Sequence, residues 1–211
     1  MTIENLVQSI LNASWGIYLV FIFIFIFMRI PKRKVFAPYQ RSRGFMVVAF
    51  FFLFSQIFLG WMLPKNTLSA EVLAAIDIPF FYIEFIFLCL AFFHLLDHSF
   101  GTYKRVLFDL LSWCAVCATC LTSLTIKNHT FQIILAFVGG VMLICFTIVC
   151  VLRFLRLHKI ARTQLDNYYT DQMYNFVLWI RRSVMFIVLF GVFSVVVLFA
   201  PYIYRVVYFV T

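Results

Sequence analysis

The chain has 211 residues, of which 65% are hydrophobic and only 12% are charged. An ordinary soluble domain is about 45–50% apolar and about 25% charged, so the composition excludes a soluble fold and predicts a multi-pass membrane protein. The formal net charge of +9 would suggest nucleic-acid binding in a soluble domain. Basic residues in cytoplasmic loops account for the excess here, and we expect no direct nucleic-acid contact by this span.

Six apolar runs follow one another along the chain, each long enough to cross a bilayer as a helix. They are residues 14–30, 45–63, 76–96, 107–126, 133–152 and 184–200. The first run alternates Phe with Ile, which leaves no polar face and is typical of a helix surrounded by lipid. The remaining residues, 201–211, are too short to span and predict the start of a seventh helix. The predicted fold is an all-α transmembrane bundle that forms one membrane domain, 1–211.

The basic residues gather in alternate connections between these runs. Fourteen of the 17 lie at 29–44, 97–106 and 153–183. The positive-inside rule places these connections in the cytoplasm and the amino terminus outside it. Six crossings from an external start also end outside, whereas a seventh would carry a following domain into the cytoplasm. We therefore expect a truncated chain that lacks a cytoplasmic effector domain.

The third run holds two acidic residues, Asp77 and Glu84. Their spacing of seven places them on one face of a helix. Glu84 would lie roughly 12 Å below the outer boundary, where a carboxylate costs a few kcal/mol unless it meets a partner, a wet cavity or a proton. Asp77, Glu84 and Arg205, which is expected on the same outer side, are thus a candidate intramembrane ligand or ion-pair site. A structural hydrogen bond to a neighbouring helix is the alternative.

Metal binding and catalysis find little support. The cysteines from Cys114 to Cys120 recur every third residue inside a spanning helix, which favours close helix packing over a metal site, and Gly139 and Gly140 fit the same role. The His and Asp residues within 94–98 lack a fourth ligand. No nucleophile with an adjacent base is apparent. We predict no metal, no cofactor and no enzymatic activity.

The interval 153–183 is the longest polar stretch between two apolar runs. Four basic residues recur every three positions and should extend the fifth helix into the cytoplasm, with a basic side toward anionic head groups: Arg153, Arg156, Lys159 and Arg162. Asp166–Asn167 is predicted to interrupt this helix, and Thr170 to cap a new one. The resulting hairpin either only anchors two crossings or couples membrane changes to the cytoplasm.

Within this interval, residues 165–183 read LDNYYTDQMYNFVLWIRRS and resemble a segment in the amino-terminal membrane regions of AraC-type transcriptional regulators from Bacteroidota. The matching residues, a candidate coupling segment, are Leu165, Asp166, Asn167, Tyr168, Tyr169, Asp171, Trp179, Arg181 and Arg182. Thr170 replaces a Ser of the family, and Gln172–Tyr174 replaces an acidic run. The resemblance implies a sensory module in the cytoplasmic (inner) membrane that precedes a helix-turn-helix domain.

The expected function is therefore that of a membrane-embedded sensory module of a one-component transcriptional regulator, which relays a signal through 153–183. A small transporter or channel subunit that uses Glu84 in a polar pathway is one alternative, and a structural, partner-binding membrane protein is another. The expected partners are the lipid bilayer and anionic lipid head groups at the basic loops. The sequence leaves open whether the chain forms a homo-oligomer.

Overall fold

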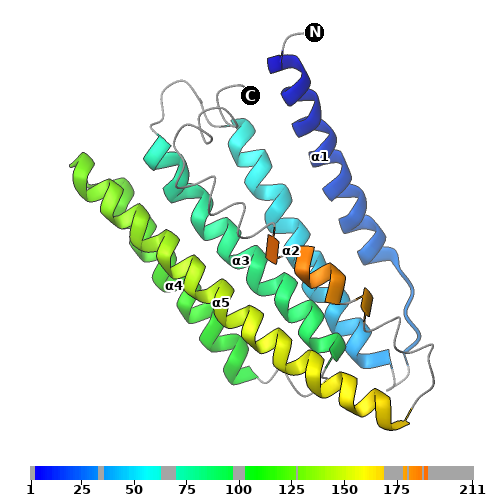
Figure 1. Cartoon of the computed structure of the whole chain (residues 1–211). Coiled ribbons are helices and arrows are strands. Elements are labelled where there is room, and N and C mark those ends of the chain that lie inside the picture. Colours follow the sequence, from blue (N-terminus) through cyan, green and yellow to red (C-terminus); the bar gives the residue numbers. More distant parts are fainter. Residues whose placement is uncertain are drawn as a thin grey trace.

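The computed structural model describes residues 3–32, 36–62, 70–96, 103–126, 128–168, 178–179, 181–186 and 188–189. Five helices account for most of these residues: α1 (Ile3–Phe27), α2 (Ala37–Met62), α3 (Ala70–Leu96), α4 (Tyr103–Thr125) and α5 (His129–Tyr168). They form a bundle of long helices, and the short helical pieces after residue 178 lie against it (Figure 1). The described residues contain no strand, so the predicted all-α class is confirmed.

Four of these helices are long and apolar enough to cross a membrane: Ala37–Leu59 in α2, Val72–Leu96 in α3, Lys104–Thr125 in α4 and His129–Ala161 in α5. The apolar part of α1, Ala13–Phe27, is shorter. This confirms a bundle of membrane-spanning helices. Most of the predicted sixth run, 184–200, lies outside the described residues, as does the predicted start of a seventh helix.

The connection between α1 and α2 is shorter than predicted. Helix α2 begins at Ala37, so Arg41 and Arg43 lie within the helix and not in a loop. Pro38 does not prevent this early start, because proline is tolerated in the first turn of a helix, where its missing N–H would have no partner. The Arg43 guanidinium donates a hydrogen bond to the backbone carbonyl of Met28 and closes the connection.

Helix α3 is the centre of the bundle. It packs against α2 on one side and against α4 and α5 on the other, while α1 reaches the bundle through α2 (Figure 1). Of the spanning segment of α3, 56% is buried, compared with 22% in α2 and in α4 and 33% in α5. The outer helices therefore turn apolar side chains toward lipid, and α3 is largely screened from it.

Aromatic side chains fill both sides of α3. Toward α2, the rings of Phe80 and Phe87 pack on Phe52, with centroid distances of 6.5 and 6.2 Å. Toward α5, Tyr82 stacks on Phe146 at 4.6 Å. Aromatic pairs at such distances add about 0.5–1.5 kcal/mol beyond the burial of their area. The α2–α3 and α3–α5 interfaces are thus each held by ring contacts.

Small residues allow α3, α4 and α5 to approach one another. A Cβ atom added to Gly139 of α5 would lie 3.3 Å from the Sγ atom of Cys120 and 3.6 Å from Cγ2 of Ile78. On α4, Val116, Cys120 and Ser123 are buried together, at a spacing that places them on one helix face. The predicted packing role is confirmed for Gly139 and Cys120.

Replacing Gly139 by Val should therefore force neighbouring side chains apart. We expect the free energy of unfolding to fall by about 1–3 kcal/mol, the usual effect of overpacking a core. The matched control is Gly16→Val in α1, because a Cβ atom at Gly16 would meet nothing within 4 Å. The measurement is thermal unfolding of the purified protein in detergent. Equal midpoints for the two variants would contradict the packing described here.

Candidate functional site

Buried polar groups mark the places where this bundle departs from a plain apolar core. Among the described residues they are Ser42, Asp77, Glu84, His94, Asp109, Ser123 and Thr147. A polar group in hydrocarbon costs free energy unless it is paired, and ionisable groups inside a membrane are functional candidates. The three buried acids belong to two clusters on opposite sides of α3.

The first cluster lies between α2 and α3. Asp77 accepts a hydrogen bond at 3.1 Å from the side-chain amide of Gln56 on α2. The sequence had suggested Arg205 as the partner of Asp77, and Arg205 lies outside the described residues. Gln56 was not singled out from the sequence, although a lone amide within an apolar run is itself a signal, because it needs a partner in the membrane.

Glu84 lies two turns further along the same side of α3. It falls between Phe80 and Phe87, whose rings both pack on α2, so its backbone position faces that helix. The side chain is 3% exposed, and its Oε1 atom has no hydrogen-bond partner among the described residues. Glu84 is therefore an incompletely satisfied acid at the interface between α2 and α3.

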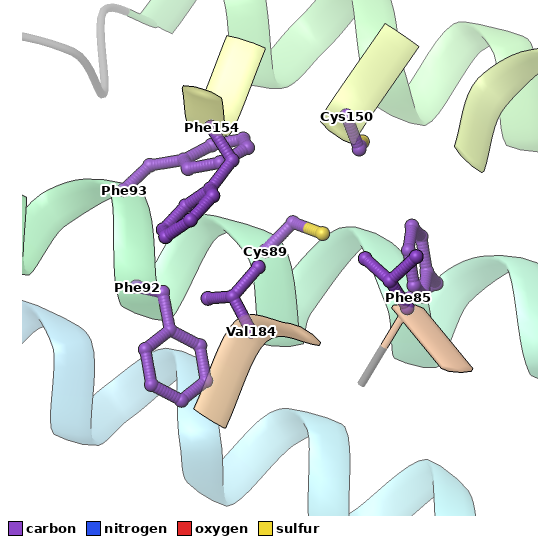
Figure 2. A pocket seen from close by; sticks show the side chains of 8 residues that line it. Phe85, Cys89, Phe92, Phe93, Cys150, Phe154 and Val184 are labelled. Atoms are coloured by element: carbon purple, nitrogen blue, oxygen red, sulfur yellow. The ribbon is translucent and has the colours of Figure 1, made fainter. Parts of the chain in front are cut away.

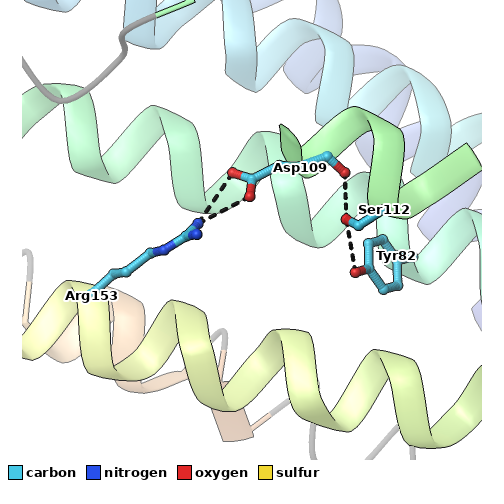
Figure 3. Close-up of polar contacts among 4 residues, drawn as sticks. All are labelled: Tyr82, Asp109, Ser112 and Arg153. Atoms are coloured by element: carbon cyan, nitrogen blue, oxygen red, sulfur yellow. Dashed lines mark hydrogen bonds and ion pairs between the residues drawn. The ribbon is translucent and has the colours of Figure 1, made fainter. Parts of the chain in front are cut away.

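The second cluster connects α3, α4 and α5 (Figure 3). The guanidinium of Arg153 on α5 donates to both carboxylate oxygens of Asp109 on α4, at 3.0 and 3.3 Å. The Ser112 hydroxyl donates to the backbone carbonyl of Asp109 at 2.6 Å and accepts a hydrogen bond from the Tyr82 hydroxyl at 3.0 Å. A continuous polar chain therefore runs from α5 through α4 to the central helix.

This cluster corrects the predicted role of Arg153. The arginine was expected on a basic side facing lipid head groups, but it turns into the bundle toward Asp109, with the two side chains 27% and 7% exposed. The cause is the buried carboxylate of Asp109, because burying this charge without a partner would cost free energy. Sequence reasoning missed Asp109, although an acid three residues inside the fourth apolar run was the signal. Arg156 and Lys159 are exposed, as expected.

A proline inside α3 provides another polar contact with α4. Pro79 has no N–H, so it cannot make the hydrogen bond that a helix residue normally donates to the preceding turn. Its carbonyl accepts a hydrogen bond from the indole N–H of Trp113 at 2.9 Å. Together with Tyr82 and Ser112, this contact fixes the rotation of α3 relative to α4.

The candidate coupling segment is only partly described. Helix α5 continues through Tyr168, so the predicted interruption at Asp166–Asn167 is wrong. The physical reason is that 153–168 contains neither proline nor glycine, and the other residues do not break a helix. Tyr169 and Asp171 lie outside the described residues. Further on, the described part includes three exposed side chains: Trp179, Arg181 and Arg182.

The described residues contain no group of three His, Cys, Asp or Glu side chains that could hold a metal ion. The thiols of Cys114 and Cys120 point differently, the first exposed and the second buried, so they do not converge. His94 stacks on Phe45, with ring centroids 5.3 Å apart. Its predicted neighbours Asp97 and His98 lie outside the described residues.

Comparison with known proteins gives no match to any protein-family model, curated protein or solved structure. The resemblance of residues 165–183 to AraC-type membrane regions therefore stays a prediction. The two polar clusters and the helices that carry them are the features that bear on function.

Removing the cation of the second cluster should destabilise the bundle. We expect Arg153→Met to lower the free energy of unfolding by about 3 kcal/mol, because it leaves the Asp109 carboxylate buried and unpaired. The double variant Asp109→Leu/Arg153→Met should recover much of this loss. Arg156→Met, an exposed position on the same helix, is the control. Denaturant unfolding in micelles measures the cycle, and a double variant as unstable as Arg153→Met would contradict the pairing.

The two acids of the first cluster should respond in opposite directions to the same replacement. Glu84→Leu removes an acid with an unsatisfied oxygen, so the free energy of unfolding should rise by about 1–3 kcal/mol. Asp77→Leu leaves the Gln56 amide without this hydrogen-bond acceptor, so the free energy of unfolding should fall by a similar amount. Thermal unfolding of both variants beside the unaltered protein provides the comparison. A loss of stability in Glu84→Leu would show that Glu84 makes stabilising contacts.

Proposed function

We propose that this chain is a membrane-embedded signalling module in which α5 carries displacements of the bundle core to the cytoplasmic side. One observation supports this proposal above all. The Asp109–Arg153 pair holds α5 inside the bundle, and the same helix continues unbroken from Arg153 to Tyr168. At a rise of 1.5 Å per residue, this extension is about 22 Å long.

The physics of the pair suits a two-state element. The Asp109 carboxylate is only 7% exposed, so the ion pair is either formed or broken, because intermediate separations leave this charge poorly solvated. Switching elements in proteins are bistable in this way, and small shifts at one site are amplified through them. A change in the α3–α4 packing that moves Asp109 would therefore tilt or release the extension of α5 as a unit.

The charge distribution supports a cytoplasmic location for this extension. Arg156 and Lys159 are exposed beyond the ion pair and would meet anionic lipid head groups. We accordingly place the amino terminus outside, with six crossings of the inner membrane. The resemblance of 165–183 makes a one-component transcriptional regulator the specific proposal, with the bilayer and its anionic head groups as partners of this span.

A second candidate function is transport of protons or other ions through the bundle. It is favoured by the Oε1 atom of Glu84, which is buried without a hydrogen bond among the described residues. The rings of Phe52, Phe80 and Phe87 on the same interface oppose it, since they offer a hydrated ion no polar ligands. The test is an ion flux, detected by a dye, in vesicles that contain the reconstituted protein. A flux that is present in the unaltered protein and abolished in Glu84→Gln would favour transport over signalling.

Signalling is tested in the native cell by exchanging single codons of the intact gene. We expect Arg153→Met to change the abundance of a set of transcripts at least twofold, and the same set to respond to deletion of the gene. Arg156→Met should leave these transcripts unchanged. Immunoblotting for protein abundance and the double variant Asp109→Leu/Arg153→Met separate loss of signalling from loss of protein. A transcript profile unaffected by deletion would refute the regulator proposal.

A further inference from the structure

Glu84 of α3 is buried without full hydrogen bonding. Its side chain is 3% exposed, and its Oε1 atom has no hydrogen-bond partner among the described residues. An acid inside a membrane is tolerated when it meets a cation, faces water, or keeps its proton and so carries no charge. Which of these applies to Glu84 depends on the groups around it.

The side chains that surround Glu84 on the α2–α3 interface are apolar. The rings of Phe80 and Phe87 flank it on α3, one turn to either side, and both pack on Phe52 of α2. Ala49 lies one turn before Phe52 on the same face of α2 and is fully buried. These groups offer no hydrogen bonds to replace the hydration of a carboxylate, which makes a charged Glu84 costly at this place.

Titratable groups are absent from the immediate described surroundings of Glu84. The part of α2 that faces it, 45–62, has no ionisable side chain. On α3, Asp77 and His94 are seven and ten residues away, or about 10 and 15 Å along the helix. Helix α1, which packs on α2, contributes only Tyr18 between residues 5 and 28. No cation in this part of the chain therefore neutralises a carboxylate, and no base lies close enough to take its proton directly.

The nearest described cavity on α3 does not hydrate Glu84. It lies on the side toward α5 and is bordered by Cys89, Cys150 and Val184 (Figure 2). Its volume is about 10 Å³ and its lining is aromatic, aliphatic and thiol. Glu84 is not among the lining residues. With neither a cation nor water in reach among the described residues, the proton is the remaining way to bury this acid.

We propose that Glu84 is a proton-binding site: the carboxyl holds its proton while α2 and α3 are packed, and loss of the proton separates these two helices. In this step the O–H bond breaks, its electron pair stays on the carboxylate, and the proton passes to a water molecule admitted between the helices. A carboxylate is stabilised where water reaches it, so deprotonation favours the open interface. Because no second base lies close by in the described part of α2 and α3, the site binds and releases a proton without passing it across the membrane.

The proton site would act on the second polar cluster through the central helix. One turn before its end of the face that carries Glu84, α3 also holds Tyr82, which donates a hydrogen bond to Ser112 of α4 at 3.0 Å. A separation of α2 from α3 would therefore reach the helix that contacts the Asp109 ion pair, and acidity would be the stimulus that α5 relays. This consequence rests on the signalling role proposed above, whereas binding of the proton does not.

Infrared spectroscopy of the unaltered protein in lipid vesicles provides the first test. At neutral pH, we expect an absorption band from the C=O group of a protonated carboxyl. Glutamate labelled with ¹³C at its side-chain carboxyl should shift this band, which identifies its source as a glutamate. A missing band would overturn the proposal. An ionised Glu84 paired with Arg205, the cation that the sequence suggests, would give that result.

Two variants assign the band to one residue. The chain has three glutamates, Glu4, Glu71 and Glu84. Glu84→Gln should remove the band, and the matched double variant Glu4→Gln/Glu71→Gln should keep it. The opposite pattern would overturn the proposal. If Glu84→Gln fails to fold, the labelled double variant decides, because Glu84 is then the only glutamate that can give the band.

Spin labels test whether loss of the proton opens the interface. Labels at the exposed positions Phe51 on α2 and Leu111 on α4 lie on either side of α3, and the six cysteines are replaced. Raising the pH should lengthen the distance between the labels over the pH range in which the infrared band disappears. In Glu84→Gln, a neutral side chain of the same shape, the distance should stay constant. An equal pH response in both proteins, or a lost band without a longer distance, would overturn the opening.

The regulatory consequence has its own readout in cells. The transcripts that respond to Arg153→Met should change with the pH of the medium in the unaltered strain and not in the Glu84→Gln strain. The same pH response in both strains would refute acidity as the stimulus. The infrared band needs no transcript readout, so a failed signalling test with the band present refutes the proposed function and leaves the proton site standing.

Discussion

Hydrocarbon offers no hydrogen bonds, and this constraint explains why α3 lies at the centre of the bundle. Helix α3 carries two acids and a tyrosine hydroxyl into the membrane, together with the backbone carbonyl of Pro79, and partners from other helices lower the cost of burying such groups. The partners come from both sides, with Gln56 on α2 and with Ser112 and Trp113 on α4. The outer helices can then present apolar surfaces to lipid, because the polar groups of α3 are enclosed.

The two sides of α3 are satisfied to different degrees. Toward α4 and α5, hydrogen bonds run without a gap from Tyr82 through Ser112 and Asp109 to Arg153. Toward α1 and α2, the carboxyl of Glu84 keeps an oxygen without a hydrogen bond among the described residues. A complete hydrogen-bond network holds helices in one arrangement. An incomplete network leaves a buried polar group without a partner, and a rearrangement of the helices could remove this free-energy cost. The unsatisfied acid on the α2 side and the hydrogen-bonded network on the α5 side agree with the proposed signalling role.

Much of the fold follows from local pattern, and the site does not. Long apolar runs require helices, and a spacing of seven places Asp77 and Glu84 on one side of α3. The ion pair joins residues 44 positions apart, and no local pattern shows that α4 and α5 bring them together. The continuation of α5 through Asp166 was missed because short polar residues were taken as a break, although weak helix formers end a helix only when a better alternative exists. The early start of α2 was missed because a basic cluster was equated with a loop.

The central claim is that the Asp109–Arg153 pair fixes α5 to the bundle so that the helix moves as a rod. Pulsed electron paramagnetic resonance tests it directly, with spin labels at the exposed positions Leu107 on α4 and Lys159 on α5 and the other cysteines replaced. The account predicts one narrow distribution of the distance between the two labels when the ion pair is intact. In Arg153→Met this distribution should be shifted or broadened. Identical narrow distributions in both proteins would contradict the claim.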